Sequence, residues 1–200
     1  MRFFLRPSKY VEPKMTISIS KWIITRPAVF CLSMIACLSC TSKQPTWYQP
    51  SYRGAKLVYL TDIEFDDGDT FNIKGKPIRV LGVDTPEIAH PDLDIFENQP
   101  YGVAASESTR AWLTRAKIIE VVRGGKDRYD RRLAHVFIDG ELLSCRLIRH
   151  GLAYETVSHY GDSGFPDLAQ EILDIWRTSE RPKFEPPYRW KNRQRKKRQR

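Results

Sequence analysis

Cysteine and histidine are both scarce in this sequence, with four of each among 200 residues. Three of the cysteines, Cys31, Cys37 and Cys40, lie within ten residues of one another, which leaves Cys145 alone in the rest of the chain. This distribution argues against a disulfide framework for the main domain. The Cys37–Cys40 pair is a weak zinc or redox signal, because no second pair and no nearby histidine completes it. The histidines show no metal-ligand spacing, so we expect them on the surface or in the core.

Long apolar runs are also missing. A helix needs about 20 apolar residues to cross a bilayer, and the uncharged, mostly apolar stretch at 27–40 is shorter than that. It follows two basic residues, Lys21 and Arg26, and a positive flank before such a run is typical of an export signal. We therefore expect residues 1–40 to be a signal segment of an exported protein of bacterial type.

The end of this apolar run resembles a bacterial lipoprotein signal, with Cys40 or Cys37 as the acylated residue. Leucine is not three residues before either cysteine, so an ordinary cleaved signal and a short membrane anchor remain alternatives. The expected location is outside the cell or in the cell envelope, with membrane attachment through the signal or a lipid. Translation starts at Met1 or at Met15.

Positive charge is concentrated at the C-terminus. The formal net charge is +9, and the last ten residues contribute seven basic side chains and no acidic one, which leaves +2 for the rest. Such a run repels itself and has little to bury, so residues 181–200 are expected to form a disordered tail. The tail could attract nucleic acid or an anionic membrane through its charge, or it could simply be a solvated terminus.

The segment between these two ends has the pattern of a single domain without internal repeats. Residues 41–55 are polar and contain two prolines, so they are expected to be a linker before a domain at 56–180. Runs rich in β-branched and aromatic residues, separated by tight turns, predict five strands, at 56–65, 70–73, 78–83, 118–122 and 132–138. Helical spacing predicts helices at 101–117, 141–150 and 167–177. This order predicts an α+β fold that is mainly β, a five-stranded OB-type barrel with about three packed helices.

Charged motifs stand at the ends of the predicted strands. Asp67-Gly-Asp-Thr70 taken alone indicates a hairpin turn. The strand that carries Arg79 runs directly into Asp84 and Glu87, and Glu87 has no obvious structural task. The third motif, Asp127-Arg-Tyr-Asp-Arg-Arg132, links the last two strands, and surface ion pairs within it would contribute little to stability.

Together the three motifs resemble the signature of the staphylococcal nuclease (thermonuclease) family. The resemblance covers residues 57–176 and includes Gly151-Leu-Ala153 after the second predicted helix. Each motif is modest alone, but their order and spacing around one barrel make a strong joint signal. The family usually has glycine before the second arginine, where this chain has Asp130, so a carboxylate could pair with Arg131 and compete with phosphate.

The resemblance implies a role for each matching residue. The metal ligands would be the carboxylates of Asp69 and Asp84 and the backbone carbonyl of Thr85. The catalytic residues would be Arg79, Glu87 and Arg131. Tyr129 and a tyrosine near Tyr160 would help to hold the nucleotide, and we expect Arg128 to support binding of nucleic acid as well.

General chemistry agrees with these roles. Oxygen-only ligands suit a hard cation such as Ca²⁺, and a bound cation polarises a phosphoryl oxygen. Two guanidiniums offer planar, bidentate contacts to phosphate, and an ionised glutamate can accept a proton from water. We therefore expect a Ca²⁺-dependent endonuclease or phosphodiesterase that acts on DNA and RNA as a monomer. The alternative is a non-catalytic OB-fold module that binds nucleic acid.

Overall fold

The computed structural model describes residues 48–199. The expected signal segment, with Cys31, Cys37 and Cys40, lies outside the described residues, as does the first half of the expected linker. Within the described part, no helix combines the length and the apolar character that a membrane crossing requires.

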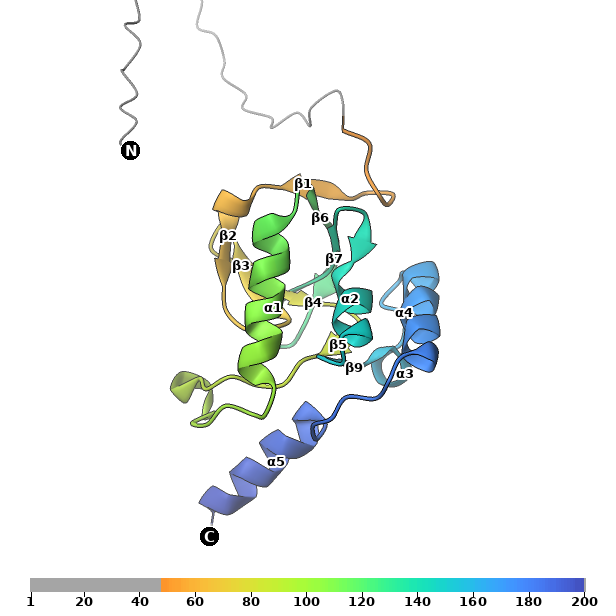
Figure 1. Cartoon of the computed structure of the whole chain (residues 1–200). Helices are drawn as coiled ribbons and strands as arrows, with labels where there is room; N and C mark the ends of the chain where they lie inside the picture. The colour runs from red at the N-terminus through yellow and green to blue at the C-terminus, as the bar shows by residue number, and fades with distance from the viewer. Residues whose placement is uncertain (1–47, 200) are drawn as a thin grey trace, which may run out of the picture. The chain divides into compact units, whose positions relative to one another are not determined.

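The centre of the domain is a curled sheet (Figure 1). Its two edge strands come from one continuous segment of the chain, residues 56–65. The sheet order is β1-β6-β7-β4-β3-β2, and β1 and β2 are two halves of the predicted first strand, separated by a 3₁₀ turn, η1. All neighbours on this path are antiparallel except β4 and β7, which are parallel. The bounds are β1 Lys56–Val58, η1 Leu60–Asp62, β2 Ile63–Phe65, β3 Thr70–Ile73, β4 Lys76–Val80, β6 Ile119–Lys126 and β7 Arg132–Ile138. This is the predicted OB-type barrel, and the α+β fold class is confirmed.

Short strands extend the barrel at two places. β8 (Glu141–Leu142) pairs with β7, while β5 (Val83–Asp84) and β9 (Tyr154–Glu155) form a separate two-stranded sheet. β5 continues the chain directly beyond β4, so this second sheet places Asp84 at the end of the barrel strand that carries Arg79.

Five helices accompany the sheet in the described part of the chain. The three helices that the sequence predicts are α1 (Gly102–Arg115), α2 (Leu143–Arg149) and α4 (Pro166–Thr178). Leu147 and Ile148 of α2 and Ile172 of α4 are buried in the common core, so α2 lies between the barrel and α4 (Figure 1). The further elements are a 3₁₀ turn η2 (Pro91–Leu93), the short α3 (Val157–Tyr160) and α5 (Pro187–Arg198).

The C-terminal segment differs from the prediction, because α5 occupies most of the expected disordered tail. Phe184 and Trp190 are only 7% and 3% exposed. The Phe184 ring lies 5.6 Å from the ring of Tyr101 and 5.4 Å from that of Tyr154. These two buried aromatics attach the segment to the domain, which therefore extends beyond residue 180.

The expected linker is also partly folded. Tyr48 is 8% exposed, and its hydroxyl donates to the fully buried carboxylate of Glu120 on β6. The backbone N–H of Ser51 donates to the same carboxylate at 2.8 Å, and so does the Ser51 hydroxyl. Since a buried carboxylate needs such donors, residues 48–55 belong to the domain, which begins earlier than residue 56.

Candidate active site

The first predicted motif forms a turn that is held from two sides. Asp67 Oδ1 accepts the backbone N–H groups of Asp69 at 2.9 Å and of Thr70 at 2.6 Å. The hydroxyl of Thr109, on α1, donates to the carbonyl of Gly68 at 2.8 Å. The turn therefore fixes Asp69, whose side chain is fully buried, at the start of β3.

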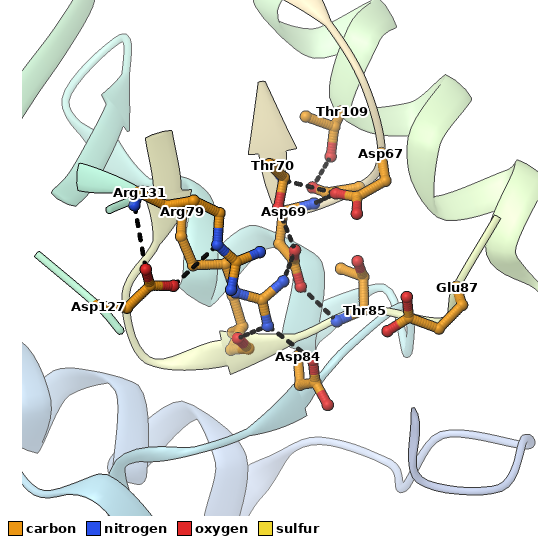
Figure 2. A network of polar contacts seen from close by, with 12 residues as sticks. Asp67, Asp69, Thr70, Arg79, Asp84, Thr85, Glu87, Thr109, Asp127 and Arg131 are labelled. Carbon is orange, nitrogen blue, oxygen red and sulfur yellow. Dashed lines mark hydrogen bonds and ion pairs between the residues drawn. The ribbon is translucent and has the colours of Figure 1, made fainter. Parts of the chain in front are cut away.

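Strand register brings Arg79 to this aspartate. Thr70 pairs with Arg79 across β3 and β4, and the N–H of Val80 donates to the carbonyl of Asp69 at 2.8 Å. One terminal nitrogen of Arg79 forms an ion pair with Asp69 Oδ1, and the other contacts Asp84 Oδ1 at 2.6 Å. Two carboxylates, one in the turn before β3 and one on β5, therefore converge on one guanidinium (Figure 2).

Thr85 completes the contacts of Asp69. Its backbone N–H donates to Asp69 Oδ2 at 2.7 Å, so both carboxylate oxygens of Asp69 have partners. Thr85 is itself 2% exposed. The three predicted metal-binding positions, Asp69, Asp84 and Thr85, are thus brought together by the fold.

Glu87 is positioned mainly through its backbone. Its N–H donates to the side-chain oxygen of Gln99 at 3.2 Å, and its carbonyl accepts the N–H of Gln99 at 2.8 Å. Gly102, the first residue of α1, lies so close that an added Cβ would stand 2.2 Å from the Glu87 carbonyl oxygen. The Glu87 side chain forms an ion pair with Lys191 of α5, with 2.7 Å between Glu87 Oε1 and Lys191 Nζ.

Charges act on one another across the whole cluster. Burial raises the pKa of Glu87, the charge of Lys191 opposes this rise, and the charges of Asp84 and Asp67 add to it. Burial also raises the pKa of Asp67, against the charge of Arg79. For Arg79, burial disfavours the charged form, but the charges of Asp84 and Asp67 outweigh burial and raise its pKa. Glu87 and Arg79 therefore belong to one electrostatic unit.

Arg131 lies beside this unit and is paired with Asp127. Its Nε contacts Asp127 Oδ2 at 2.8 Å, and its charge acts on Asp66 and Asp67. The expectation that Asp130 competes for Arg131 is not met, because Asp130 pairs with Lys126 instead. Asp130 has a φ of 62°, in the left-handed region where glycine is favoured and aspartate is tolerated better than most residues.

The expected nucleotide-binding side chains lie on the surface. Tyr129 is 63% exposed, and the guanidiniums of Arg128 and Arg131 stand 4.8 Å and 5.6 Å from its ring centroid. Tyr129 and Arg128 are therefore close to Arg131. Tyr160 is 76% exposed on α3, and its ring contact is with His159, so the structure does not bring Tyr160 into contact with the cluster.

Comparison with known proteins places the second and third motifs in a family, while the first motif, at 67–70, precedes the matched region. Residues 77–173 match the family described as "Staphylococcal nuclease homologue". This region of the chain belongs to the staphylococcal nuclease homologue family. The match begins at the strand of Arg79 and includes Asp84, Glu87 and Arg131.

Named relatives agree with this assignment. The chain is 40% identical over 92 residues to a "Thermonuclease" of Staphylococcus intermedius, an alignment that covers 44% of this chain and 53% of the relative. It is 35% identical over 138 residues to "Endonuclease YncB" of Bacillus subtilis, covering 62% of this chain and 64% of the relative. It is also 34% identical over 134 residues to "SPbeta prophage-derived endonuclease YokF" of Bacillus subtilis, covering 58% of this chain and 44% of the relative. The chain thus spans between 44% and 64% of the length of these relatives.

The chemistry of the carboxylates fits a hard cation. Among residues 48–199 there is no group of three or more His, Cys, Asp or Glu side chains arranged to hold a metal ion. The staphylococcal nuclease domain instead offers two carboxylates, Asp69 and Asp84, that share one cationic partner, and this partner is the guanidinium of Arg79. Two carboxylates with a backbone carbonyl, completed by water, are an oxygen set that Ca²⁺ accepts.

Several residues that hold the site were not identified from the sequence. Gln99 and Gly102 position Glu87, and Thr109 secures the first turn. Lys191 forms an ion pair with Glu87, and Asp127 forms an ion pair with Arg131. Asp127 lies inside the third motif and could have been selected by its spacing of four residues from Arg131. The others act through contacts between segments far apart in the sequence, for which the sequence carries no local signal.

Proposed function

We propose that this domain is a Ca²⁺-dependent nuclease that hydrolyses phosphodiester bonds of DNA and RNA. The observation that carries the proposal is the convergence of Asp69 and Asp84 on one cationic position, with Glu87 in the same electrostatic unit and Arg131 beside it. The relatives named as thermonuclease and endonuclease support the same reaction class.

Asp69, Asp84 and the carbonyl of Thr85 would hold Ca²⁺, which supplies charge that polarises a phosphoryl oxygen when it is bound. The Glu87 side chain is 12% exposed and lies 2.7 Å from the ammonium group of Lys191. It would accept a proton from the attacking water as the new P–O bond forms. Burial excludes bulk water around this carboxylate and strengthens its electrostatic effect.

Arg131 and Arg79 would donate N–H groups to the non-bridging oxygens, where negative charge builds in the transition state. Arg131 has a side chain that is 32% exposed, so it is accessible to a phosphate. The Arg79 side chain is 18% exposed, and it would contact phosphate only after its ion pairs with Asp69 and Asp84 break. We therefore assign to Arg79 a second role, that of holding the two carboxylates together before a metal ion binds.

A non-catalytic OB-fold binding module is supported less well. Such a module needs a basic groove and exposed aromatic side chains, and Tyr129 with Arg128 would provide these. It has no use for a fully buried Asp69 that shares a cation with Asp84, since burial of unneeded charge is costly.

The test is hydrolysis of DNA and RNA by the purified full-length chain, with Ca²⁺ and with an excess of chelator. We expect cleavage only with Ca²⁺. Glu87→Gln and Arg131→Ala should each lower kcat by about 10²-fold or more, with circular dichroism unchanged. The matched control is Arg115→Gln, a loss of charge on an exposed residue at the far end of α1. Cleavage by both site variants at the wild-type rate would refute the site, and cleavage in chelator would refute the role of the metal.

We also propose that the chain is exported through its N-terminal segment and that Cys40 or Cys37 is the lipidated residue if it is anchored. The proposal is supported by the basic and apolar pattern of residues 21–40. Cell fractionation of the wild type and of a Cys37→Ser/Cys40→Ser variant tests it. Release of this variant from the membrane fraction is expected for a lipoprotein, while recovery of the wild type in the cytoplasm would contradict export.

A further inference from the structure

Helix α5 begins at the catalytic carboxylate of the proposed site. Phe184 and Trp190 are buried against the domain, and the side-chain N–H₂ of Gln99 donates to the carbonyl of Glu185 at 2.5 Å. Gln99 is the same residue that brackets the backbone of Glu87. Lys191 Nζ then stands 2.7 Å from Glu87 Oε1, so α5 leaves the domain from the end where α1 begins (Figure 1).

Beyond Trp190 the helix carries only basic and amide side chains, without an apolar or acidic residue up to Arg200. Lys191 is paired with Glu87, and Arg193 is paired with Glu185 at 2.7 Å. The exposed Lys196 and Lys197 have no acidic partner among residues 48–199. The cationic face of α5 is defined by residues at helical spacing that surround one shallow hollow, Arg189, Asn192, Arg193, Lys196 and Lys197.

We propose that the cationic face of α5 is a second part of the substrate interface, which binds the backbone phosphates of the nucleic-acid strand as it leaves the active site. The proposal rests on the proposed function and adds to it a preference for long strands. Residues 191–197 rise roughly 10 Å along the helix axis, which corresponds to about three phosphates at about 3.4 Å per strand step. Lys191, which pairs with Glu87, lies on the opposite side of the helix from this face and marks where α5 itself meets the site.

The composition of α5 favours nucleic acid over a membrane surface. A helix that lies in a membrane interface needs an apolar face that enters the lipid. In α5 the large apolar side chain is Trp190, and it is 3% exposed because it packs on the domain. Tyr188, 55% exposed and beside Arg189, can instead stack on a base.

The experiment measures both binding and cleavage by the full-length chain, with Lys196→Gln/Lys197→Gln as the test variant. Glutamine keeps a good helix former at both positions. The matched control is Arg115→Gln/Lys117→Gln, which removes two exposed cations at the opposite end of α1. Fluorescence anisotropy gives the Kd for a labelled single strand of about 20 nucleotides, and kinetics give kcat/KM for this strand and for a dinucleotide.

In the test variant we expect Kd for the strand to rise about tenfold at low salt, and the slope of log Kd against log salt to become shallower by about 1.4. The ratio of kcat/KM for the strand to that for the dinucleotide should fall by a similar factor, and the control should keep the wild-type ratio. An unchanged Kd and ratio would overturn the proposal. So would a loss of binding to vesicles of phosphatidylglycerol with strand binding intact, since α5 would then serve a membrane. If the wild type binds the strand through α5 but cleaves neither substrate, the proposed nuclease function fails and the interface stands.

Discussion

Arg79→Gln should destabilise the metal-free protein far more than its surface neighbour Arg131→Gln does. The change removes the cation that Asp69 and Asp84 share, and Asp69 is fully buried. Removal of one partner of a buried ion pair costs about 3–5 kcal/mol, because a charge is left uncompensated. Asp69 keeps the N–H of Thr85, at 2.7 Å, and the hydroxyl of its neighbour at position 70, at 3.2 Å, so we expect the lower end, about 3 kcal/mol.

In the proposed function, Ca²⁺ and the guanidinium of Arg79 bind the same two carboxylates, so the size of this destabilisation should depend on Ca²⁺. A ligand at 100 times its Kd stabilises the native state by about 2.7 kcal/mol. In Arg79→Gln the carboxylates of Asp69 and Asp84 are free to take the ion without displacing an arginine, so its gain should exceed that of the wild type. The stability gap of about 3 kcal/mol in chelator should therefore narrow to about 1 kcal/mol or less in saturating Ca²⁺.

Urea denaturation followed by tryptophan fluorescence measures both quantities without reference to activity. The control Arg131→Gln should lose at most about 1 kcal/mol, because Arg131 is 32% exposed and such pairs contribute little. Its partner Asp127 also keeps the backbone N–H groups of Tyr129 and Arg131. The reasoning fails if Arg79→Gln is as stable as the wild type in chelator. An equal stability gap with and without Ca²⁺ would show that Ca²⁺ does not bind at the two carboxylates that Arg79 contacts.

Three further outcomes follow from single residues. Burial lowers the pKa of His135 from 6.5 to about 4, so the unfolded chain takes up its proton first as the pH falls. The free energy of unfolding should then decrease between about pH 6.5 and pH 4, by up to about 3 kcal/mol, and in urea titrations His135→Phe should remove this loss while the exposed His159→Gln should not. Asp130→Gly should change the cleavage rate less than about twofold in the nuclease assay, because Asp130 does not contact Arg131. A tenfold rise in this rate would instead indicate that Asp130 competes with phosphate for Arg131. Tyr48→Phe should cost about 1–3 kcal/mol by urea denaturation, since it leaves buried Glu120 with one donor fewer, and an unchanged midpoint would show that residues 48–55 are not part of the folded domain.

The barrel could be predicted because its strands are short, alternating and separated by Asp-Gly and Gly-Lys turns. The break of the first strand at Leu60–Asp62 could not, since residues 56–65 read as one continuous β-rich run. The break follows from closure: the first half pairs with β6 and the second half pairs with β3, at opposite ends of the sheet order. One straight strand cannot serve both neighbours, and this constraint belongs to the closed sheet rather than to the local sequence.

Helix α5 was missed for a different reason. A run of like charges predicts repulsion and disorder, and the local sequence from Lys191 onward offers nothing to bury. The anchors lie just before it, in Phe184 and Trp190, and they bind surfaces built from residues about 30 and more positions away, such as Tyr154. The conformation of this segment is therefore set by contacts with the rest of the domain, which its own charge pattern does not reveal.

Strand register explains how side chains far apart in the sequence come together in the proposed site. The pairing of Thr70 with Arg79 places Asp69 beside the guanidinium, and the parallel pairing of Arg79 with Leu133 places Arg131 only two residues from the same level. Because successive side chains of a strand point to opposite faces, a slip of one residue in β4 would turn Arg79 away from both partners. The buried Ile78 and Val80 on either side of Arg79 would be turned toward the charged site by the same slip. The hydrophobic core therefore fixes the register that assembles the site, so a substitution such as Ile78→Thr, far from any phosphate, should lower activity and stability together.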